Sequence, residues 1–184
     1  QAVGAAMAFA YRGEDSIACT WLGEGTSAQG DFHYGLNFAS VYQAPCVLVV
    51  VNNQWAISTH RNLAHGGPSF AARGIPYKVA SIRVDGQDLL AVYAAHKWAT
   101  ERARAGHGPT LLEMYTYRCD SHSSSDDPSI YRPGDGYENW PLGDPVDRLK
   151  AHLMKMGEWD DERHEALEAQ CKDEIIVAYK EAEK

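Results

Sequence analysis

Apolar and polar residues form two kinds of segment that alternate along the chain. Runs of apolar and β-branched residues predict four strands, at 16–22, 46–51, 78–84 and 109–117. Apolar residues at helical spacing predict three helices, at 1–11, 30–42 and 87–106, with only a short turn expected near 69–73. Because strands and helices alternate, the pattern predicts an α/β fold with a parallel sheet flanked by helices.

The stretch from Arg118 to Asn139 breaks this alternation. It is rich in Ser, Asp, Pro and Gly, and it is long for a loop inside a compact domain, so it is expected to be functional or disordered. Two helices, at 145–156 and 160–183, follow it, and the second has an apolar stripe typical of a surface helix. We therefore expect one domain over 1–184, with an α/β core at 1–118, a loop at 119–139 and a helical tail at 140–184.

The start of the chain predicts that it is a piece of something longer. The sequence QAVGAAMAFAYRG has no initial Met and no helix cap, as though it began inside a helix. Its small residues suit close packing against another element. We expect the chain to be the C-terminal part of a longer protein.

Composition narrows the classes of function. With 184 residues, 45% hydrophobic and 23% charged, the chain suits one soluble domain, and its net charge of −8 argues against nucleic acid as a partner. The longest apolar run, 45–51, is too short to span a bilayer, and no signal-peptide pattern is present. The four cysteines form no CxxC pair, and Cys19 and Cys46 fall in predicted strands as buried free thiols. A reducing compartment fits, either the cytoplasm or the mitochondrial matrix of a eukaryote.

The candidate chemistry lies between Trp21 and Ile57. Gly23-Glu24-Gly25 follows the first predicted strand in this stretch and Asn52-Asn53 follows the second, with 26 residues (26–51) between them, enough for a helix, a turn and a strand. The carboxyl ends of parallel strands meet at one edge of the sheet. The spacing therefore predicts oxygen ligands brought together in one place.

These residue types favour a magnesium–diphosphate site. Glu24 offers a carboxylate, Asn53 an amide oxygen and Trp55 a backbone carbonyl, all ligands that Mg²⁺ accepts. Gly23 and Gly25 allow the backbone to approach a diphosphate closely, and N–H groups from Thr26 onward would face it at the start of the next helix.

Several strings also carry a family resemblance. Gly-Glu-Gly, a spacer and Asn-Asn resemble the thiamine diphosphate motif, usually Gly-Asp-Gly and Asn-Asn. The strings GEGTSAQGD, NFAS, NNQWAIST, AARG, IRVDGQD, TYRCDSHSSSDDPSIYR and QAVGAA resemble the alpha subunit of the 2-oxo acid dehydrogenase decarboxylase component, branched-chain (2-oxoisovalerate) type. The resemblance reaches from residue 1 to about residue 135 and implies a Rossmann-like, thiamine diphosphate-binding fold, with 119–139 as the active-site loop.

The resemblance implies roles for residues of this chain. Glu24, Asn53 and the Trp55 carbonyl would bind Mg²⁺. The cofactor contacts would be Gly23, Glu24, Gly25, Thr26, Ser27, Asn53, Gln54, Trp55, Ala56, Ile57 and His122. His122 would be the catalytic residue at the mouth of the site, reaching the phosphate end of the cofactor, and Arg118, Asp126, Asp127 and Tyr131 would order its loop.

Three departures from the family pattern follow. Glu24 replaces the commoner Asp, as in the branched-chain type. Ser123 matches a serine phosphorylated in regulated members, but Pro133 stands where the second regulatory serine is expected, which argues against kinase control. The half of the site that holds the far side of the diphosphate with a Tyr-Arg pair has no counterpart in the chain.

The implied activity is oxidative decarboxylation of 2-oxoisovalerate-type acids, with acyl transfer to a lipoyl arm. The implied partners are a beta subunit in a heterotetramer of two alpha and two beta chains, which supplies the activating glutamate, and a lipoyl-bearing acyltransferase. Membranes and nucleic acids are not among the expected partners. The alternatives are a pyruvate dehydrogenase alpha subunit, or a fragment that folds but is inactive alone.

Each candidate has an ordinary structural explanation too. Gly-Glu-Gly alone is common in surface turns, and His122 alone would be a solvated loop histidine. His33, His60, His65 and His96 are expected to be surface or packing residues. Asp126 and Asp127 could form another metal site, but ordering of the loop explains them better.

Overall fold

The protein contains a four-stranded parallel sheet, seen in a computed structural model that describes residues 1–134 and 136–183. Asp135, in the expected loop, and Lys184, at the end of the expected tail, lie outside the described residues. The sheet has the order β1-β2-β6-β5, with strands β1 (Ala18–Gly23), β2 (Cys46–Asn52), β6 (Thr110–Tyr115) and β5 (Ala80–Asp85). The predicted parallel α/β fold is confirmed.

The three long predicted helices of the core are confirmed to within about two residues at each end. They are α1 (Ala2–Tyr11), α2 (Gly30–Val41) and α4 (Leu89–Arg104). Short elements fill the connections: η1 (Thr26–Ala28), the hairpin β3 (Trp55–Ala56) with β4 (Thr59–His60), α3 (Arg61–Ala64), η2 (Ala71–Tyr77) and η3 (Pro128–Ile130). The short turn expected near 69–73 is a longer 3-10 segment, η2.

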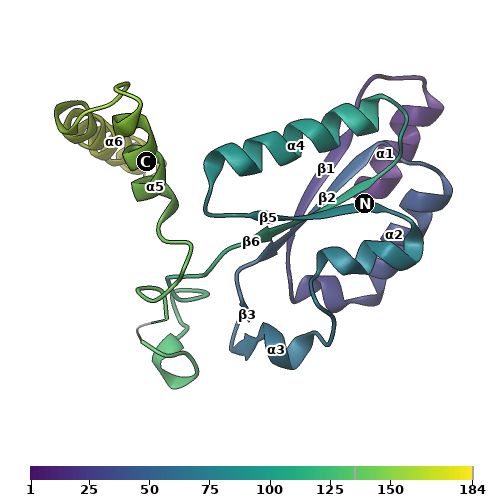
Figure 1. Cartoon of the computed structure of the whole chain (residues 1–184), viewed down its shortest axis with the longest axis horizontal. Coiled ribbons are helices and arrows are strands. Elements are labelled where there is room, and N and C mark those ends of the chain that lie inside the picture. The colour runs from purple at the N-terminus through teal and green to yellow at the C-terminus, as the bar shows by residue number, and fades with distance from the viewer. Residues whose placement is uncertain (135, 184) are drawn as a thin grey trace. The chain divides into compact units, whose positions relative to one another are not determined.

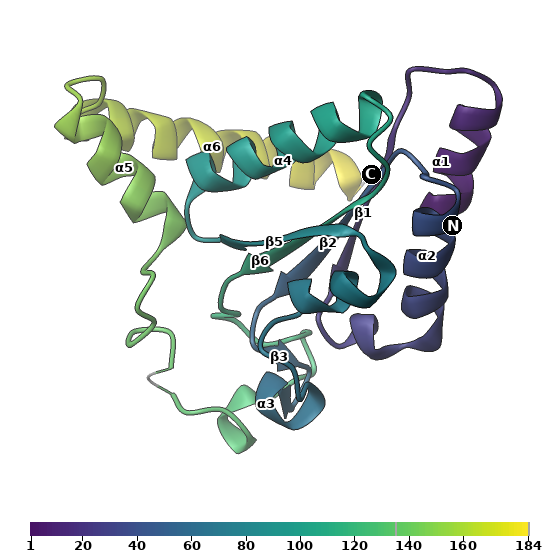
Figure 2. The same ribbon diagram turned by 45° about the vertical axis from the view of Figure 1, so that its right-hand side comes forward.

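Helices cover both faces of the sheet, as Figures 1 and 2 show. One face packs against α1, α2 and η2 through buried residues that include Ala6, Leu36 and Phe70. The other packs against α4 through Ala95, Ala99 and their neighbours. Each face of the sheet therefore has its own apolar core.

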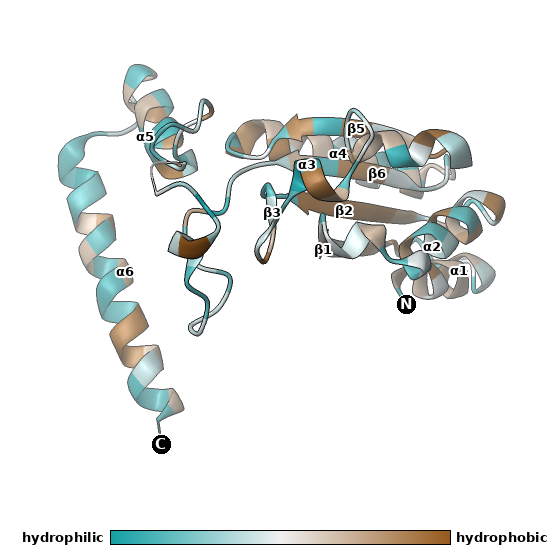
Figure 3. Cartoon of the chain, turned by 90° about the horizontal axis from the view of Figure 1, so that it is seen from below, coloured by the Kyte–Doolittle hydropathy of each residue, from teal (hydrophilic) through white to brown (hydrophobic). Residues whose placement is uncertain are grey.

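The two inner strands are buried on both faces, which explains their continuous apolar sequences. Figure 3 shows β2 as hydrophobic along its length. β1 lies at an edge of the sheet, and its residues alternate between buried or partly buried and exposed. The prediction of a buried Cys19 is wrong, because Cys19 is exposed on this edge strand, whereas Cys46 on the inner strand β2 is buried as predicted.

The C-terminal residues 144–184 pack into a compact unit of their own, distinct from residues 1–143. It contains α5 (Pro145–Lys155) and α6 (Asp161–Ala182), capped by the side chains of Asp144 and Asp160. Lys150 joins the two helices through an ion pair with Asp161, with nitrogen and oxygen 2.8 Å apart. Among the helices of the described residues, none has the length and apolar character needed to cross a bilayer.

The packing of α2 generates a test of this architecture. Leu36 is fully buried against the sheet, while Phe38 is 51% exposed on the other side of the helix. Leu36→Ala should lower the free energy of unfolding by about 2–5 kcal/mol, the usual cost of a cavity in a core. Phe38→Ala is the matched control and should change it by no more than about 0.5 kcal/mol. Urea denaturation of both variants measures this, and equal losses would contradict the assigned face of α2.

Candidate cofactor site

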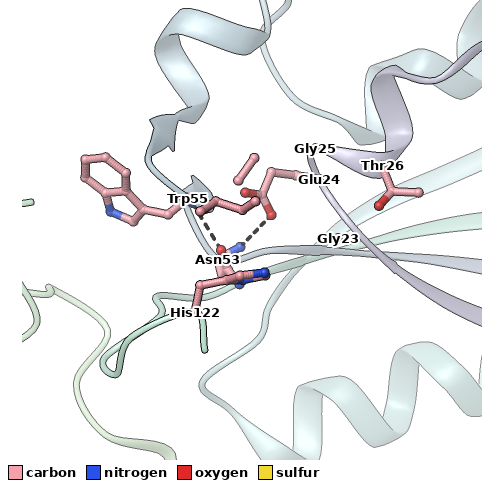
Figure 4. Close-up of a pocket in the computed structure, with 9 residues that line it drawn as sticks. Gly23, Glu24, Gly25, Thr26, Asn53, Trp55 and His122 are labelled. Atoms are coloured by element: carbon pink, nitrogen blue, oxygen red, sulfur yellow. Dashed lines mark hydrogen bonds between the residues drawn. The ribbon is translucent and has the colours of Figure 1, made fainter. Parts of the chain in front are cut away.

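Parallel pairing of β1 and β2 brings the two sequence landmarks together. Gly23 pairs with Val51 at the carboxyl ends of the strands, and the Glu24 N–H donates to the Val51 carbonyl at 3.2 Å. The Asn53 N–H in turn donates to Glu24 Oε2 at 3.4 Å, as drawn in Figure 4. Two residues that are 29 positions apart in the sequence therefore share one hydrogen bond at the edge of the sheet.

A cavity of about 390 Å³ opens at this edge. Nine of the predicted cofactor contacts line it: Gly23, Glu24, Gly25, Thr26, Asn53, Trp55, Ala56, Ile57 and His122. The other two, Ser27 and Gln54, are buried next to the cavity and are not among its lining residues. The structure thus gathers residues from three separate segments around one space.

The cavity has two walls, one formed by Gly23 to Thr26 and the other by Asn53 to Ile57. Gly25 lies close to Ala56 on the second wall. A Cβ atom at this position would lie 2.6 Å from the Cβ of Ala56. Gly25 has an ordinary helical conformation, with φ of −61°, so space rather than backbone freedom requires a glycine here.

Glu24 is a buried side chain whose negative charge is only partly compensated. It is only 2% exposed, and Oε1 has no hydrogen-bond partner among the described residues. Burial raises the pKa of Glu24, and hydrogen bonds from backbone N–H groups and the charge of Arg118 offset this only in part. A buried carboxylate oxygen without a partner is costly unless a cation or donor compensates it, so this atom fits a bound divalent ion.

The other two predicted metal ligands lie in the turn after β2. Asn53 Oδ1 accepts a hydrogen bond from the Trp55 N–H at 3.1 Å, and the Trp55 carbonyl accepts one from Arg118 Nη1 at 3.2 Å. Each oxygen keeps a second lone pair. The described residues contain no cluster of three or more His, Cys, Asp or Glu side chains suited to a metal, so any ion here would take amide, carbonyl and cofactor oxygens beside one carboxylate.

The turn that carries these oxygens is strained and held in place. Gln54 and Ile57 have positive φ angles of 76° and 55°, unusual for residues other than glycine. The Gln54 side chain donates from Nε2 to the carbonyl and Oδ1 of Asn52 and to the Thr116 carbonyl, at 3.0–3.2 Å. From its buried position next to the cavity, Gln54 therefore fixes the conformation of the wall formed by Asn53 to Ile57.

Ser27 performs a similar task on the other wall. It is fully buried, and its hydroxyl donates to the Glu24 carbonyl. Arg73 on η2 donates to both the carbonyl and, at 2.6 Å, the hydroxyl of Ser27. The loop that carries Glu24 is thus tied to a segment 46 residues further along the chain.

His122 reaches the cavity from the loop after β6. Its side chain is exposed, and its backbone N–H donates to Asp126 Oδ2 at 2.8 Å. Tyr131 donates to the same oxygen and accepts from Arg118, each at 2.6 Å, and the Tyr131 hydrogen bond is the main cause of a lowered pKa at Asp126. Asp127 caps η3. The predicted role of Arg118, Asp126, Asp127 and Tyr131 in ordering the loop stays a prediction, and these contacts within the loop support it.

Sequence reasoning missed how the walls are held. It assigned no role to Arg73 or Glu113, and it did not foresee that Arg118 binds the Trp55 carbonyl. One signal was available: Glu113 interrupts the apolar run PTLLEMY, and a charged residue in a buried strand needs a buried partner. Nothing near Arg73 in the sequence points to Ser27.

The contact at Gly25 generates a test with a built-in rescue. Gly25→Ala places its methyl against Ala56, so the walls must separate and the thermal midpoint should fall by several degrees. Adding Ala56→Gly removes the methyl that is struck and should restore most of the loss. Differential scanning calorimetry of both variants measures this, with Ala56→Gly alone as the control. A double variant no more stable than Gly25→Ala would show that the clash is not the cause.

Comparison with known proteins adds an independent result. The family model described as "Dehydrogenase E1 component" matches residues 1–184. The chain is 54% identical over its whole length to a 2-oxoisovalerate dehydrogenase subunit alpha of Pseudomonas aeruginosa, 45% of which it covers. It is 45% identical over 93% of its length to a 3-methyl-2-oxobutanoate dehydrogenase subunit alpha of Mycobacterium tuberculosis, covering 47% of that protein.

A third relative carries a different name. The chain is 42% identical over 99% of its length to a pyruvate dehydrogenase E1 component subunit alpha of Acholeplasma laidlawii, covering 53% of it. The chain thus spans about half the length of the curated relatives it matches. Since the family model covers every residue and the fold agrees with it, the chain belongs to the dehydrogenase E1 component family.

Proposed function

We propose that the chain is the metal- and diphosphate-binding part of the alpha subunit of a thiamine diphosphate-dependent 2-oxo acid dehydrogenase, of the branched-chain type. The observation that carries the proposal is the free Oε1 of Glu24, a buried carboxylate oxygen without a partner among the described residues, in a cavity beside Asn53 and the Trp55 carbonyl. When bound, thiamine diphosphate supplies the electron sink for decarboxylation of a 2-oxo acid and carries the acyl group to a lipoyl arm.

The residues of this chain bind and orient the cofactor in this proposal. Glu24, the Asn53 amide oxygen and the Trp55 carbonyl would hold Mg²⁺, which would neutralise the diphosphate. Gly23, Gly25 and Thr26 line the cavity and would lie against the diphosphate, near the N–H groups that open η1. Ala56 and Ile57 line the same cavity, while Ser27 and Gln54 hold the two walls from behind.

His122 lines the cavity from an exposed loop and would be placed to donate a hydrogen bond at the phosphate end of the cofactor. Its loop is ordered through Asp126 and Arg118, and Arg118 also binds the carbonyls of Trp55 and Ile57. The loop is therefore connected by hydrogen bonds to the wall that carries the proposed metal ligands. In this proposal a beta subunit would contribute the glutamate that activates the cofactor.

The names of the relatives support this assignment. Two of the relatives above are named for branched-chain 2-oxo acids, and the 54% identity to one of them exceeds the 42% identity to the pyruvate enzyme subunit. Their description as alpha subunits favours a beta subunit as partner, in an assembly that also meets a lipoyl-bearing acyltransferase. Pyruvate dehydrogenase is the second candidate, and a folded but inactive fragment is the third.

Replacing the proposed metal ligand should separate stability from binding. Without metal, the folded chain holds the Glu24 proton more tightly than the unfolded chain does, because burial raises this pKa. The free energy of unfolding therefore falls as pH rises from the ordinary glutamate pKa through the raised one. Glu24→Gln should remove this slope and make the metal-free chain more stable near pH 7, by on the order of 1 kcal/mol.

The same variant should lose the cofactor. Isothermal calorimetry with Mg²⁺ and thiamine diphosphate, on the chain alone and co-expressed with a beta chain, should give heat for the parent and none for Glu24→Gln. Parent binding should also weaken as pH falls through the raised pKa, because the proton competes with the metal. Unchanged binding by Glu24→Gln would remove Glu24 from the ligand set, and silence of the parent in both settings would overturn the cofactor proposal.

The substrate is tested on the assembled enzyme. A full-length alpha subunit containing this chain, combined with its beta subunit, should turn over 2-oxoisovalerate with a kcat/KM at least about tenfold above that for pyruvate, since one or two methylenes in an apolar pocket give about that discrimination. Reduction of a lipoyl acceptor reports the reaction. Equal or faster turnover of pyruvate would select the pyruvate dehydrogenase alternative.

A further inference from the structure

Glu113 is a charged residue at the centre of the sheet. It lies on the inner strand β6 and is fully buried, between neighbours Leu112 and Met114 that pack into an apolar core. It takes no part in lining the cavity. A buried carboxylate in such a position is tolerated only if both oxygens are compensated.

Three groups compensate this carboxylate. Asn52 Nδ2 donates to Oε1 at 2.7 Å, and the Ala71 N–H donates to Oε2 at 2.8 Å. Arg83, across the strand pair from β5, places Nε 3.7 Å from Oε1. The donors come from β2, η2 and β5, so one side chain joins three segments that are distant in the sequence.

The contact with Asn52 controls the turn that carries the Asn53 and Trp55 oxygens. Because Asn52 Nδ2 is bound by Glu113, its Oδ1 faces the other way and accepts from the N–H and Nε2 of Gln54. These bonds hold the positive φ of Gln54. The orientation of the Asn52 amide therefore sets the path of the next three residues.

The contact with Ala71 controls the opposite wall. Ala71 begins η2, and two residues later Arg73 binds both the carbonyl and the hydroxyl of Ser27. The Ser27 hydroxyl binds the Glu24 carbonyl. Fixing the start of η2 thus fixes the loop that carries Glu24.

We propose that Glu113 is a positioning residue that sets the spacing between the two walls of the cofactor site, acting on one through Asn52 and on the other through Ala71. The inference deepens the proposed function and rests on it. Glu113 touches neither cofactor nor metal; it determines whether the ligand oxygens of Glu24, Asn53 and Trp55 face one another.

The numbers of hydrogen-bond donors and acceptors at this pair predict that two single substitutions each break the hydrogen bonds and that the double substitution restores them. In Glu113→Gln, the new amide has one acceptor oxygen for two donors, the Asn52 amide and the Ala71 N–H, so its own NH₂ must face one of them. Turning the Asn52 amide over only moves the conflict to the Gln54 N–H. In Asn52→Asp, a carboxylate faces the Glu113 carboxylate. Glu113→Gln therefore leaves two hydrogen-bond donors facing each other, and Asn52→Asp leaves two acceptors facing each other.

The double variant Glu113→Gln with Asn52→Asp satisfies again the groups that link the two walls, while Arg83 Nε would face the new NH₂ group. The Gln amide donates to the Asp carboxylate, its oxygen accepts from the Ala71 N–H, and the Asp still accepts from Gln54. The pair keeps one negative charge, which now lies on the side chain at position 52. The hydrogen bond between positions 52 and 113 keeps its place, but its donor now lies at position 113 and its acceptor at position 52. The two walls therefore stay connected.

The first measurement needs no cofactor. Amide hydrogen exchange, followed by NMR in the chain alone, should show the Gln54 and Ala71 amides exchanging at least about tenfold faster in both single variants and near the parent rate in the double variant. Val47→Ala, a change of a fully buried residue in the core on the α4 face, is the control for general loss of stability. Unchanged exchange at both amides in the single variants would overturn the proposal.

The second measurement uses Mg²⁺ and thiamine diphosphate in calorimetry, well below the thermal midpoint of every variant. Each single variant should bind about 10- to 100-fold more weakly, as for other groups that orient metal ligands, and the double variant should recover most of this. Val47→Ala should bind like the parent. Single variants that exchange faster but bind like the parent would make Glu113 merely structural and overturn the positioning role. A parent that binds nothing would instead overturn the proposed function, and exchange alone would then decide whether Glu113 links the walls.

Discussion

Parallel pairing between β1 and β2 is the interaction on which the candidate site depends. Gly23 and Val51 are partners in register; β1 ends at Gly23 and β2 one residue later, at Asn52, so both chains leave the sheet at the same edge. The Glu24 N–H continues the ladder by one bond, to the Val51 carbonyl. A shift of the register would carry Glu24 away from Asn53, so the apolar packing of β2 against both cores fixes the ligand geometry as well as the fold.

Two buried glutamates at this sheet have opposite environments, and the contrast separates structure from binding. Glu113 has a hydrogen bond at each oxygen and an arginine nearby, so its charge is compensated within the chain. Glu24 is equally hidden but has one oxygen without a partner among the described residues. Burying an uncompensated carboxylate lowers the stability of a protein. This cost is offset when a bound cation or donor compensates the charge.

The sequence pattern predicted the sheet, the long helices and the gathering of Glu24 with Asn53, because these follow from local periodicity and from the rule that parallel strands end at one edge. It failed where one long-range contact decides. Cys19 is exposed because β1 is an edge strand, which its apolar sequence does not reveal. The Arg73–Ser27 and Asn52–Glu113 contacts join residues 46 and 61 positions apart, and no spacing rule encodes them.

The candidate site combines residues at the ends of buried strands with an exposed loop that carries His122. The ligand oxygens belong to backbone and side chains at strand ends, held by Gln54, Ser27 and the buried network behind them. His122 instead lies on an exposed loop that is attached by the polar contacts of Arg118 and Asp126. This division suits the proposed site, in which the metal–diphosphate geometry would stay constant while the mouth admits a substrate and a carrier arm. Because Arg118 binds the carbonyls of both Trp55 and Ile57, one side chain holds both the loop that carries His122 and the turn that carries the proposed ligand oxygens.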